Sequence, residues 1–196
     1  MIVCCLDMEG VLTPEIWIRV AERTGVPELR LTTRDIPDYD ALMRRRLAIL
    51  RRHGIRLRDI QSVIARMEPL PGARRFLDRL RTERQVVILS DTYYEFAMPL
   101  VRKLGLPTLL CNWLSTDRKG FISRYHLRQK NGKQNAVRAF KRIGFRVHAA
   151  GDSFNDILML KAADRAVFFS PPPAIARQFP EIRVTRNYAA LAKALL

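Results

Sequence analysis

The sequence contains few cysteines and no long apolar run. Its 196 residues include only Cys4, Cys5 and Cys111, without a Cys-x-x-Cys pair. This pattern indicates neither a disulfide framework nor a zinc site, so we expect reduced thiols that act as small buried apolar groups. No apolar stretch approaches the roughly 20 residues that cross a bilayer, and Asp7 comes too early for the apolar core of a signal peptide. We therefore expect a cytoplasmic protein with no membrane partner.

Acidic residues are also scarce. The chain has 19 Asp and Glu against 35 Lys and Arg, which gives a formal net charge of +16. Such a charge attracts anions of every kind. The arginines are dispersed, however, with short runs such as those at 44–46 and 51–52 and no basic tail. We therefore expect small phosphorylated molecules rather than nucleic acid as partners, and a basic, non-enzymatic nucleic-acid binder is the remote alternative.

The apolar pattern changes character along the chain. The run Ile2–Leu6 predicts a buried strand, and from residue 72 onward strands and helices alternate, which predicts a doubly wound, Rossmann-like parallel sheet of the α/β class. Between these segments the pattern predicts only helices, the first beginning at Thr13-Pro14-Glu15 and the others at 38–53 and 58–67. We therefore predict a core domain of residues 1–12 and 72–196, with an inserted helical cap of residues 13–71.

A second insertion is smaller. Residues 108–111 read as a strand of the core, and residues 113–115 and 121–126 read as two further short strands. The segments 113–115 and 121–126 are separated by Asp117-Arg118-Lys119-Gly120, a turn-forming sequence. This arrangement predicts a β-hairpin flap beside the core.

Carboxylates follow two of the expected strands. Asp7 and Glu9 come directly after Ile2–Leu6, and Asp152 and Asp156 come directly after residues 147–150. Because the carboxyl ends of parallel strands meet at one edge of a sheet, where ligands bind, we expect these side chains to lie close together. Clustered carboxylates suit a hard cation such as Mg²⁺, so the sequence predicts a metal-binding site at this edge.

Asp7 is the candidate nucleophile. A carboxylate can form an aspartyl-phosphate, and an aspartate with the reference pKa of about 3.9 is already ionised at pH 7. Glu9 follows two residues later, so in an extended segment its side chain lies on the same side as that of Asp7. We expect Glu9 to be the general acid that protonates the leaving alcohol and then deprotonates water.

A hydroxyl and an ammonium group complete a phosphoryl-transfer site. Ser90 follows the strand-like run 86–89, and its hydroxyl can hydrogen-bond a phosphoryl oxygen, while a lysine neutralises the charge. Lys130 and Lys133 are the two candidates for the lysine. We prefer Lys133 because it immediately precedes the helix-forming run 134–143.

The order of these parts resembles the haloacid dehalogenase-like (HAD) phosphatases. The likeness runs from Asp7 to Asp156, and the position of the helical insertion is similar to that in the phosphoserine phosphatase branch. The resemblance implies a magnesium ion held by Asp7, Asp152 and the backbone carbonyl of Glu9, with Asp156 supporting the site from behind these ligands. It also implies that Asn155 contacts phosphate or substrate. Members of the family usually have aspartate in place of Glu9.

Two charged residues of the expected cap resemble substrate-binding residues of that branch. Glu15 would take the substrate ammonium and Arg46 the carboxylate, which suits a bidentate guanidinium. The alternative for Arg46 is one more surface arginine among many. Ser90-Asp91-Thr92 departs from the usual Ser-Gly-Gly and is more similar to the bifunctional phosphoserine phosphatases and homoserine phosphotransferases. Asp91 and Thr92 are therefore also expected at the substrate.

The resemblance implies an enzyme that is both a hydrolase and a transferase. It would hydrolyse O-phospho-L-serine in L-serine biosynthesis, with Mg²⁺ as cofactor, and would pass the phosphoryl group to homoserine as well as to water. The alternative is a HAD phosphatase for another small phosphorylated metabolite. Glu15 and Arg46 discriminate between these two substrate classes, because a sugar phosphate has no ammonium for Glu15 and no carboxylate for Arg46. The sequence does not indicate the oligomeric state.

Overall fold

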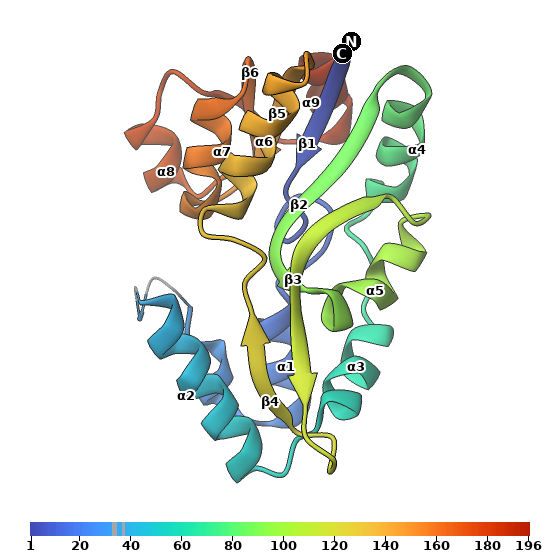
Figure 1. Ribbon diagram of the computed structural model, residues 1–196. Coiled ribbons are helices and arrows are strands. Elements are labelled where there is room, and N and C mark those ends of the chain that lie inside the picture. Colours follow the sequence, from blue (N-terminus) through green and yellow to red (C-terminus); the bar gives the residue numbers. More distant parts are fainter. Residues whose placement is uncertain (33–34, 37) are drawn as a thin grey trace.

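The computed structural model describes residues 1–32, 35–36 and 38–196, and this part of the chain contains a seven-stranded sheet (Figure 1). The strands lie in the order β4-β3-β2-β1-β5-β6-β7. Neighbouring strands are parallel except β3 and β4, which are antiparallel. The bounds are β1 Ile2–Leu6, β2 Gln85–Tyr93, β3 Thr108–Thr116, β4 Ile122–His126, β5 Arg146–Gly151, β6 Arg165–Phe169 and β7 Arg183–Thr185.

The sheet is doubly wound, as predicted. From β1 the chain adds β2 and β3 on one side and β5, β6 and β7 on the other, which places the topological switch point beside β1. None of the helices in the described residues is long and apolar enough to span a membrane. The helices are α1 Ile16–Thr24, η1 Pro27–Arg30, α2 Tyr39–Arg52, α3 Leu57–Ala65, α4 Ala73–Glu83, α5 Tyr94–Lys103, α6 Gly132–Arg142, η2 Phe154–Asp156, α7 Ile157–Ala162, α8 Pro173–Gln178 and α9 Tyr188–Leu195.

Helices cover both faces of the sheet (Figure 1). In β1, Val3 and Cys5 pack against α6, α7 and α8, whereas Cys4 and Leu6 pack against the side formed by α4, α5 and α9. All four side chains are buried, which explains why this strand is a continuous apolar run rather than an alternating one. The cysteines are free, as predicted, although Cys111 is only partly buried.

The expected helical cap is present as α1, η1, α2 and α3, which lie together with the β3–β4 hairpin at one end of the molecule (Figure 1). Cap residues such as Ile16 and Ile60 belong to the same hydrophobic cluster as Phe76 of α4. The two connections between cap and core lie side by side, since the Leu70 amide donates to the Leu12 carbonyl at 2.9 Å. The division at residues 12/13 and 71/72 stays a prediction.

The predicted start of the first cap helix is wrong. The helix begins at Ile16, whereas the sequence places its cap at Thr13. The Thr13 hydroxyl instead donates to the Met8 carbonyl at 3.3 Å. The first amide of the helix, that of Ile16, donates to the Glu9 carboxylate at 2.8 Å from seven residues away. Proximity in space, rather than the local sequence, therefore caps this helix.

The predicted hairpin flap is confirmed, but its first strand is not a separate element. Residues 108–111 and 113–115, expected as two strands, are parts of one strand, β3 Thr108–Thr116. Its first half pairs with β2 in the core, and its second half pairs with β4. The flap is thus a direct extension of the sheet. It is tied to the cap by a hydrogen bond from the Leu57 amide to the Gly120 carbonyl at 3.0 Å.

Candidate active site

One cavity of about 210 Å³ gathers almost all of the predicted site residues at the carboxyl ends of β1, β2 and β5. The predicted residues that line it are Asp7, Glu9, Glu15, Arg46, Ser90, Asp91, Thr92, Lys133, Asp152 and Asn155. The other lining residues were not predicted as site residues from the sequence; they are Trp17, Ile18, Thr32, Tyr39, Leu42, Tyr93, Ser153 and Phe154. Several of these were expected only as apolar faces of helices, and no local signal separates such a residue from an ordinary core residue.

Asp7 continues the β1 ladder by one residue beyond the strand. Its amide donates to the Ala150 carbonyl of β5 at 2.9 Å, which fixes the backbone at the switch point. The side chain is 5% exposed, and its Oδ1 accepts a hydrogen bond from the Lys133 Nζ at 2.7 Å. The second carboxylate oxygen, Oδ2, is not used by this contact and is available for chemistry.

Lys133 lies in the first turn of α6 and is buried at 7% exposure. Its Nζ is 2.7 Å from Asp7 Oδ1 and 2.8 Å from Asp156 Oδ1. Burial disfavours the ammonium, but the charges of Asp156 and Asp7 hold the pKa of Lys133 well above its usual 10.5. The competing candidate, Lys130, is exposed on the preceding loop. The geometry therefore favours Lys133 as the lysine of the site.

Asp156 organises the loop that follows β5. Its Oδ2 accepts the backbone amides of Asp152 and Ser153, at 2.9 Å and 3.1 Å, while Oδ1 accepts from Lys133. Both oxygens are thus engaged, and the residue is fully buried. Gly151 lies against it so closely that a Cβ at this position would overlap the Asp156 side chain. These contacts support the expectation that Asp156 acts from behind the ligands rather than as one of them.

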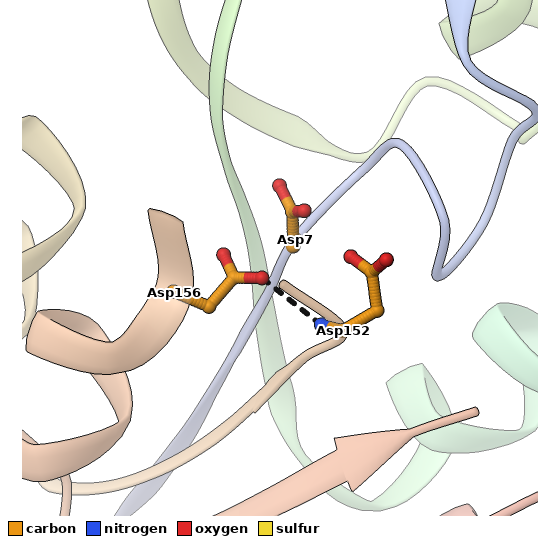
Figure 2. A group of neighbouring side chains, drawn as sticks. All are labelled: Asp7, Asp152 and Asp156. Carbon is orange, nitrogen blue, oxygen red and sulfur yellow. Dashed lines mark hydrogen bonds between the residues drawn. The ribbon is translucent and has the colours of Figure 1, made fainter. Parts of the chain in front are cut away.

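The carboxylates of Asp7, Asp152 and Asp156 gather around the end of β1 (Figure 2), with one oxygen of each lying within 4.8 Å of the others. Lys133 is the ammonium that contacts this group, so the carboxyl groups outnumber it. Burial together with the Asp156 charge raises the pKa of Asp7 well above its usual 3.8 and the pKa of Asp152 to about 7. A nearby cation favours the ionised form of such carboxyl groups, and an oxygen-only donor set fits a divalent cation such as Mg²⁺.

Glu9 has two roles in the structure. Its Oε2 accepts the Ile16 amide at the start of α1, so the side chain joins the β1 loop to the cap. Burial, and then the neighbouring Glu15 carboxylate, raises the pKa of Glu9 from 4.5 to about 8. This raised pKa favours the protonated carboxyl group, which suits a general acid.

The end of β2 supplies a hydroxyl donor to the cavity. Ser90 Oγ accepts the Thr92 amide at 3.2 Å, which leaves the hydroxyl proton free to donate to a phosphoryl oxygen. The Asp91 carboxylate is half exposed and 3.8 Å from the Lys133 Nζ. The Asp91 carbonyl accepts from the Asn112 side chain of β3 at 2.9 Å, which holds this end of β2 in place.

Arg46 is buried rather than a surface arginine, with 6% exposure. Its guanidinium lies over the Trp17 ring at 4.3 Å, and one terminal nitrogen donates to the Leu31 carbonyl at 2.7 Å. No carboxylate among the described residues pairs with it, and its buried Nε has no partner there. A buried guanidinium without a counter-ion is costly unless an anionic ligand completes it. Glu15, by contrast, is an exposed residue at the edge of the same cavity.

A sequence model of the haloacid dehalogenase-like hydrolases matches residues 3–164. The chain belongs to this family. A curated relative, the phosphoserine phosphatase of Pseudomonas syringae pv. tomato, is 53% identical over 191 residues, covering 97% of this chain and 81% of that protein. A second, the phosphoserine phosphatase ThrH of Pseudomonas aeruginosa, is 53% identical over 196 residues, covering 100% of this chain and 96% of that protein.

Solved structures have the same fold at low sequence identity. An apo phosphoserine phosphatase superposes with a TM-score of 0.80 at 21% identity, covering 99% of this chain and 98% of that chain. A phospho-aspartyl intermediate analogue of phosphoserine phosphatase gives a TM-score of 0.78 at 20% identity, with the same coverage. These matches confirm the predicted fold class for this enzyme.

Gly10 offers a test of the Asp152 position. Gly10 has a φ of 80°, and a Cβ there would overlap the Asp152 carboxylate, whereas Gly25 has a φ of 68° with nothing within 4 Å. Gly10→Ala and Gly25→Ala should both lose about 1 to 2 kcal/mol of stability, because alanine is strained in the left-handed region. Only Gly10→Ala should also lose Mg²⁺-dependent activity, because the Asp152 side chain must move. Thermal unfolding and a magnesium titration of activity would measure both effects, and equal activity in the two variants would contradict this placement of Asp152.

Proposed function

We propose that this enzyme is an Mg²⁺-dependent phosphatase that hydrolyses O-phospho-L-serine to L-serine and phosphate through an aspartyl-phosphate on Asp7. The observation that carries the proposal is the composition of the cavity. It holds Asp7, Lys133 and Ser90, which suit a phosphoryl group. It also holds the Arg46 guanidinium, which pairs with no carboxylate of the described residues and suits the carboxylate of a substrate. The names of the two curated relatives support the same substrate.

In the first half-reaction Asp7 attacks the phosphorus. The oxygen that is not hydrogen-bonded to Lys133 forms the new bond, and the bond to the serine oxygen breaks. Glu9 donates its proton to the departing serine oxygen, as its raised pKa allows. Lys133 and Ser90 hold the phosphoryl oxygens, where most of the catalysis of this reaction resides.

In the second half-reaction the ionised Glu9 takes a proton from water, and the water oxygen attacks the phosphorus. Phosphate leaves, Asp7 is regenerated as a carboxylate, and Glu9 is again protonated. Asp7, Asp152 and the Glu9 backbone carbonyl would hold the magnesium ion, and Asp156 would keep the Asp152 loop in position. Magnesium, when bound, supplies positive charge against the phosphoryl oxygens.

Substrate choice rests on the cap. Arg46 would bind the carboxylate of phosphoserine and Glu15 its ammonium, while Asp91, Thr92 and Asn155 lie around the same cavity. A HAD phosphatase for another small phosphorylated metabolite stays the alternative, and a sugar phosphate would leave the Arg46 guanidinium unpaired. The cytoplasmic location, the place in L-serine biosynthesis and the absence of a nucleic-acid partner stay predictions.

Transfer of the phosphoryl group to homoserine is the second activity that we propose. An alcohol bound where serine departed can be deprotonated by Glu9 and attack the aspartyl-phosphate, in the reverse sense of the first step. Homoserine is longer than serine by one methylene, and one methylene gives only about 1 to 3 kcal/mol of discrimination. The serine pocket should therefore admit homoserine as an acceptor in competition with water.

The role of Asp7 is tested by Asp7→Asn. The amide cannot act as the nucleophile and is a poorer metal ligand, so we expect phosphatase activity to fall to background with the fold retained. The matched control is Asp78→Asn, which changes an exposed carboxylate on α4 and should leave activity unchanged. Phosphate release and circular dichroism measure the two properties. Substantial activity in a folded Asp7→Asn variant would refute the proposal.

The role of Arg46 is tested by Arg46→Ala with Arg45→Ala as its control, since Arg45 is the exposed neighbour on the same helix. Truncating one partner of a buried charge pair costs about 2 to 5 kcal/mol, so kcat/KM for phosphoserine should fall correspondingly in Arg46→Ala alone. Activity on p-nitrophenyl phosphate, which lacks carboxylate and ammonium, should fall far less. Equal losses on both substrates would show that Arg46 is structural or catalytic instead.

Phosphoryl transfer is tested by incubating the enzyme with phosphoserine, Mg²⁺ and increasing homoserine. Serine, inorganic phosphate and phosphohomoserine are measured separately. We expect serine release to exceed phosphate release by the amount of phosphohomoserine formed. If serine and phosphate stay equal and no phosphohomoserine appears at high homoserine, the transferase activity is excluded and the phosphatase remains.

A further inference from the structure

Two tyrosines from distant parts of the chain meet in the wall of the active-site cavity. Tyr39 is the first residue of α2 in the cap, and Tyr93 is the last residue of β2 in the core. Their hydroxyl oxygens are 2.7 Å apart, and both residues line the cavity together with Arg46. Neither tyrosine is used by the phosphoryl-transfer steps described above.

The two hydroxyl groups together carry two protons but form one hydrogen bond with each other. Either hydroxyl can donate to the other, so one of the two protons fills the mutual hydrogen bond. The second proton has no acceptor among the described residues. Burial raises the pKa of Tyr39 to about 12 and the pKa of Tyr93 even further, so both remain neutral donors. A buried donor without an acceptor is unfavourable, and a ligand acceptor would satisfy it.

The tyrosine rings are held firmly in place. Tyr93 is 1% exposed and packs edge-on against Phe96 at a centroid distance of 5.7 Å. Tyr125, from β4 of the flap, packs edge-on against both Tyr39 and Tyr93, at 6.1 Å and 6.5 Å. Cap, core and flap therefore each contribute one ring to this cluster, which holds the hydroxyl pair in the cavity wall.

The hydroxyl pair lines the same cavity as the guanidinium of Arg46, which pairs with no carboxylate of the described residues. Arg46 is among the charges that act on both tyrosines, and it lies two turns beyond Tyr39 on the same helix, α2. The buried Arg46 Nε also has no partner among the described residues. Arg46 and the hydroxyl pair thus line one small cavity, and an anionic group with two oxygens is the chemistry that would accept hydrogen bonds from both.

We propose that the Tyr39–Tyr93 hydroxyl pair is a second donor for the substrate carboxylate, beside Arg46, and so determines specificity for phosphorylated amino acids. This inference rests on the proposed function, because it requires a substrate that carries a carboxylate. Since Tyr39 belongs to the cap and Tyr93 to the core, the donor pair forms only when α2 lies against the end of β2. Recognition of the carboxylate is thereby linked to the position of the cap.

The experiment compares Tyr39→Phe, Tyr93→Phe and the double variant on two substrates. O-phosphoserine carries the carboxylate, whereas O-phosphoethanolamine has the same phosphate and ammonium but no carboxylate. The matched control is Tyr125→Phe, which removes a hydroxyl from the same ring cluster without breaking the Tyr39–Tyr93 hydrogen bond. Circular dichroism and thermal unfolding verify that each variant is folded.

The donor role predicts an asymmetric result. The variant that removes the hydroxyl facing the carboxylate should lose about 10- to 100-fold in kcat/KM for phosphoserine, as expected for a hydrogen bond to a charged group. The double variant should match it. The other single variant should stay close to wild type, because the remaining hydroxyl keeps its proton for the substrate. Activity on phosphoethanolamine, and the Tyr125→Phe control, should be unchanged.

A purely structural contact predicts a different pattern. If the pair only fastens the cap to the core, both single variants and the double variant should lose activity equally, and on both substrates. That result, or no loss in the double variant, would overturn the inference and leave the proposed function intact. Wild-type enzyme that fails to hydrolyse phosphoserine would instead contradict the proposed function itself.

Discussion

The rest of the site depends on the ion pairs of the buried Lys133 ammonium. The ammonium joins Asp7, at the end of β1, to Asp156, after β5, through contacts of 2.7 Å and 2.8 Å. Burial of a charge is costly, and removal of one partner from such a network leaves an uncompensated charge. The same contacts set the position of the nucleophile and the shape of the Asp152 loop. The ion pairs of Lys133 therefore both balance the buried charges and position the side chains around them.

The carboxyl groups outnumber the ammonium group that contacts them, so this centre suits a further cation. Gly10 leaves room for the Asp152 carboxylate only because it has no Cβ. Glu9 connects this charged centre to the cap, since the carboxyl group that faces the cavity also accepts the first amide of α1. The carboxyl group that we propose as the proton donor therefore also caps the first helix of the cap.

Core and cap contribute different side chains to the cavity. The groups that we propose for phosphoryl transfer come from the carboxyl ends of the core strands and the start of α6, while Arg46 and Tyr39 come from one helix of the cap. The cap shares a single hydrophobic cluster with the core, and its two connections are hydrogen-bonded to each other. This arrangement fixes the distance between the two ends of a cavity that suits a small zwitterionic phosphate.

The sequence by itself determined the fold class, the cap and flap insertions, and the residues that meet at the sheet edge. It did so because short apolar runs define parallel strands, and parallel strands bring the residues that follow them to one edge. Tertiary structure alone decided the capping of α1 by Glu9 and the pairing of Tyr39 with Tyr93 across 54 positions. These contacts depend on how separate elements pack, and no local pattern of residues encodes such a distance.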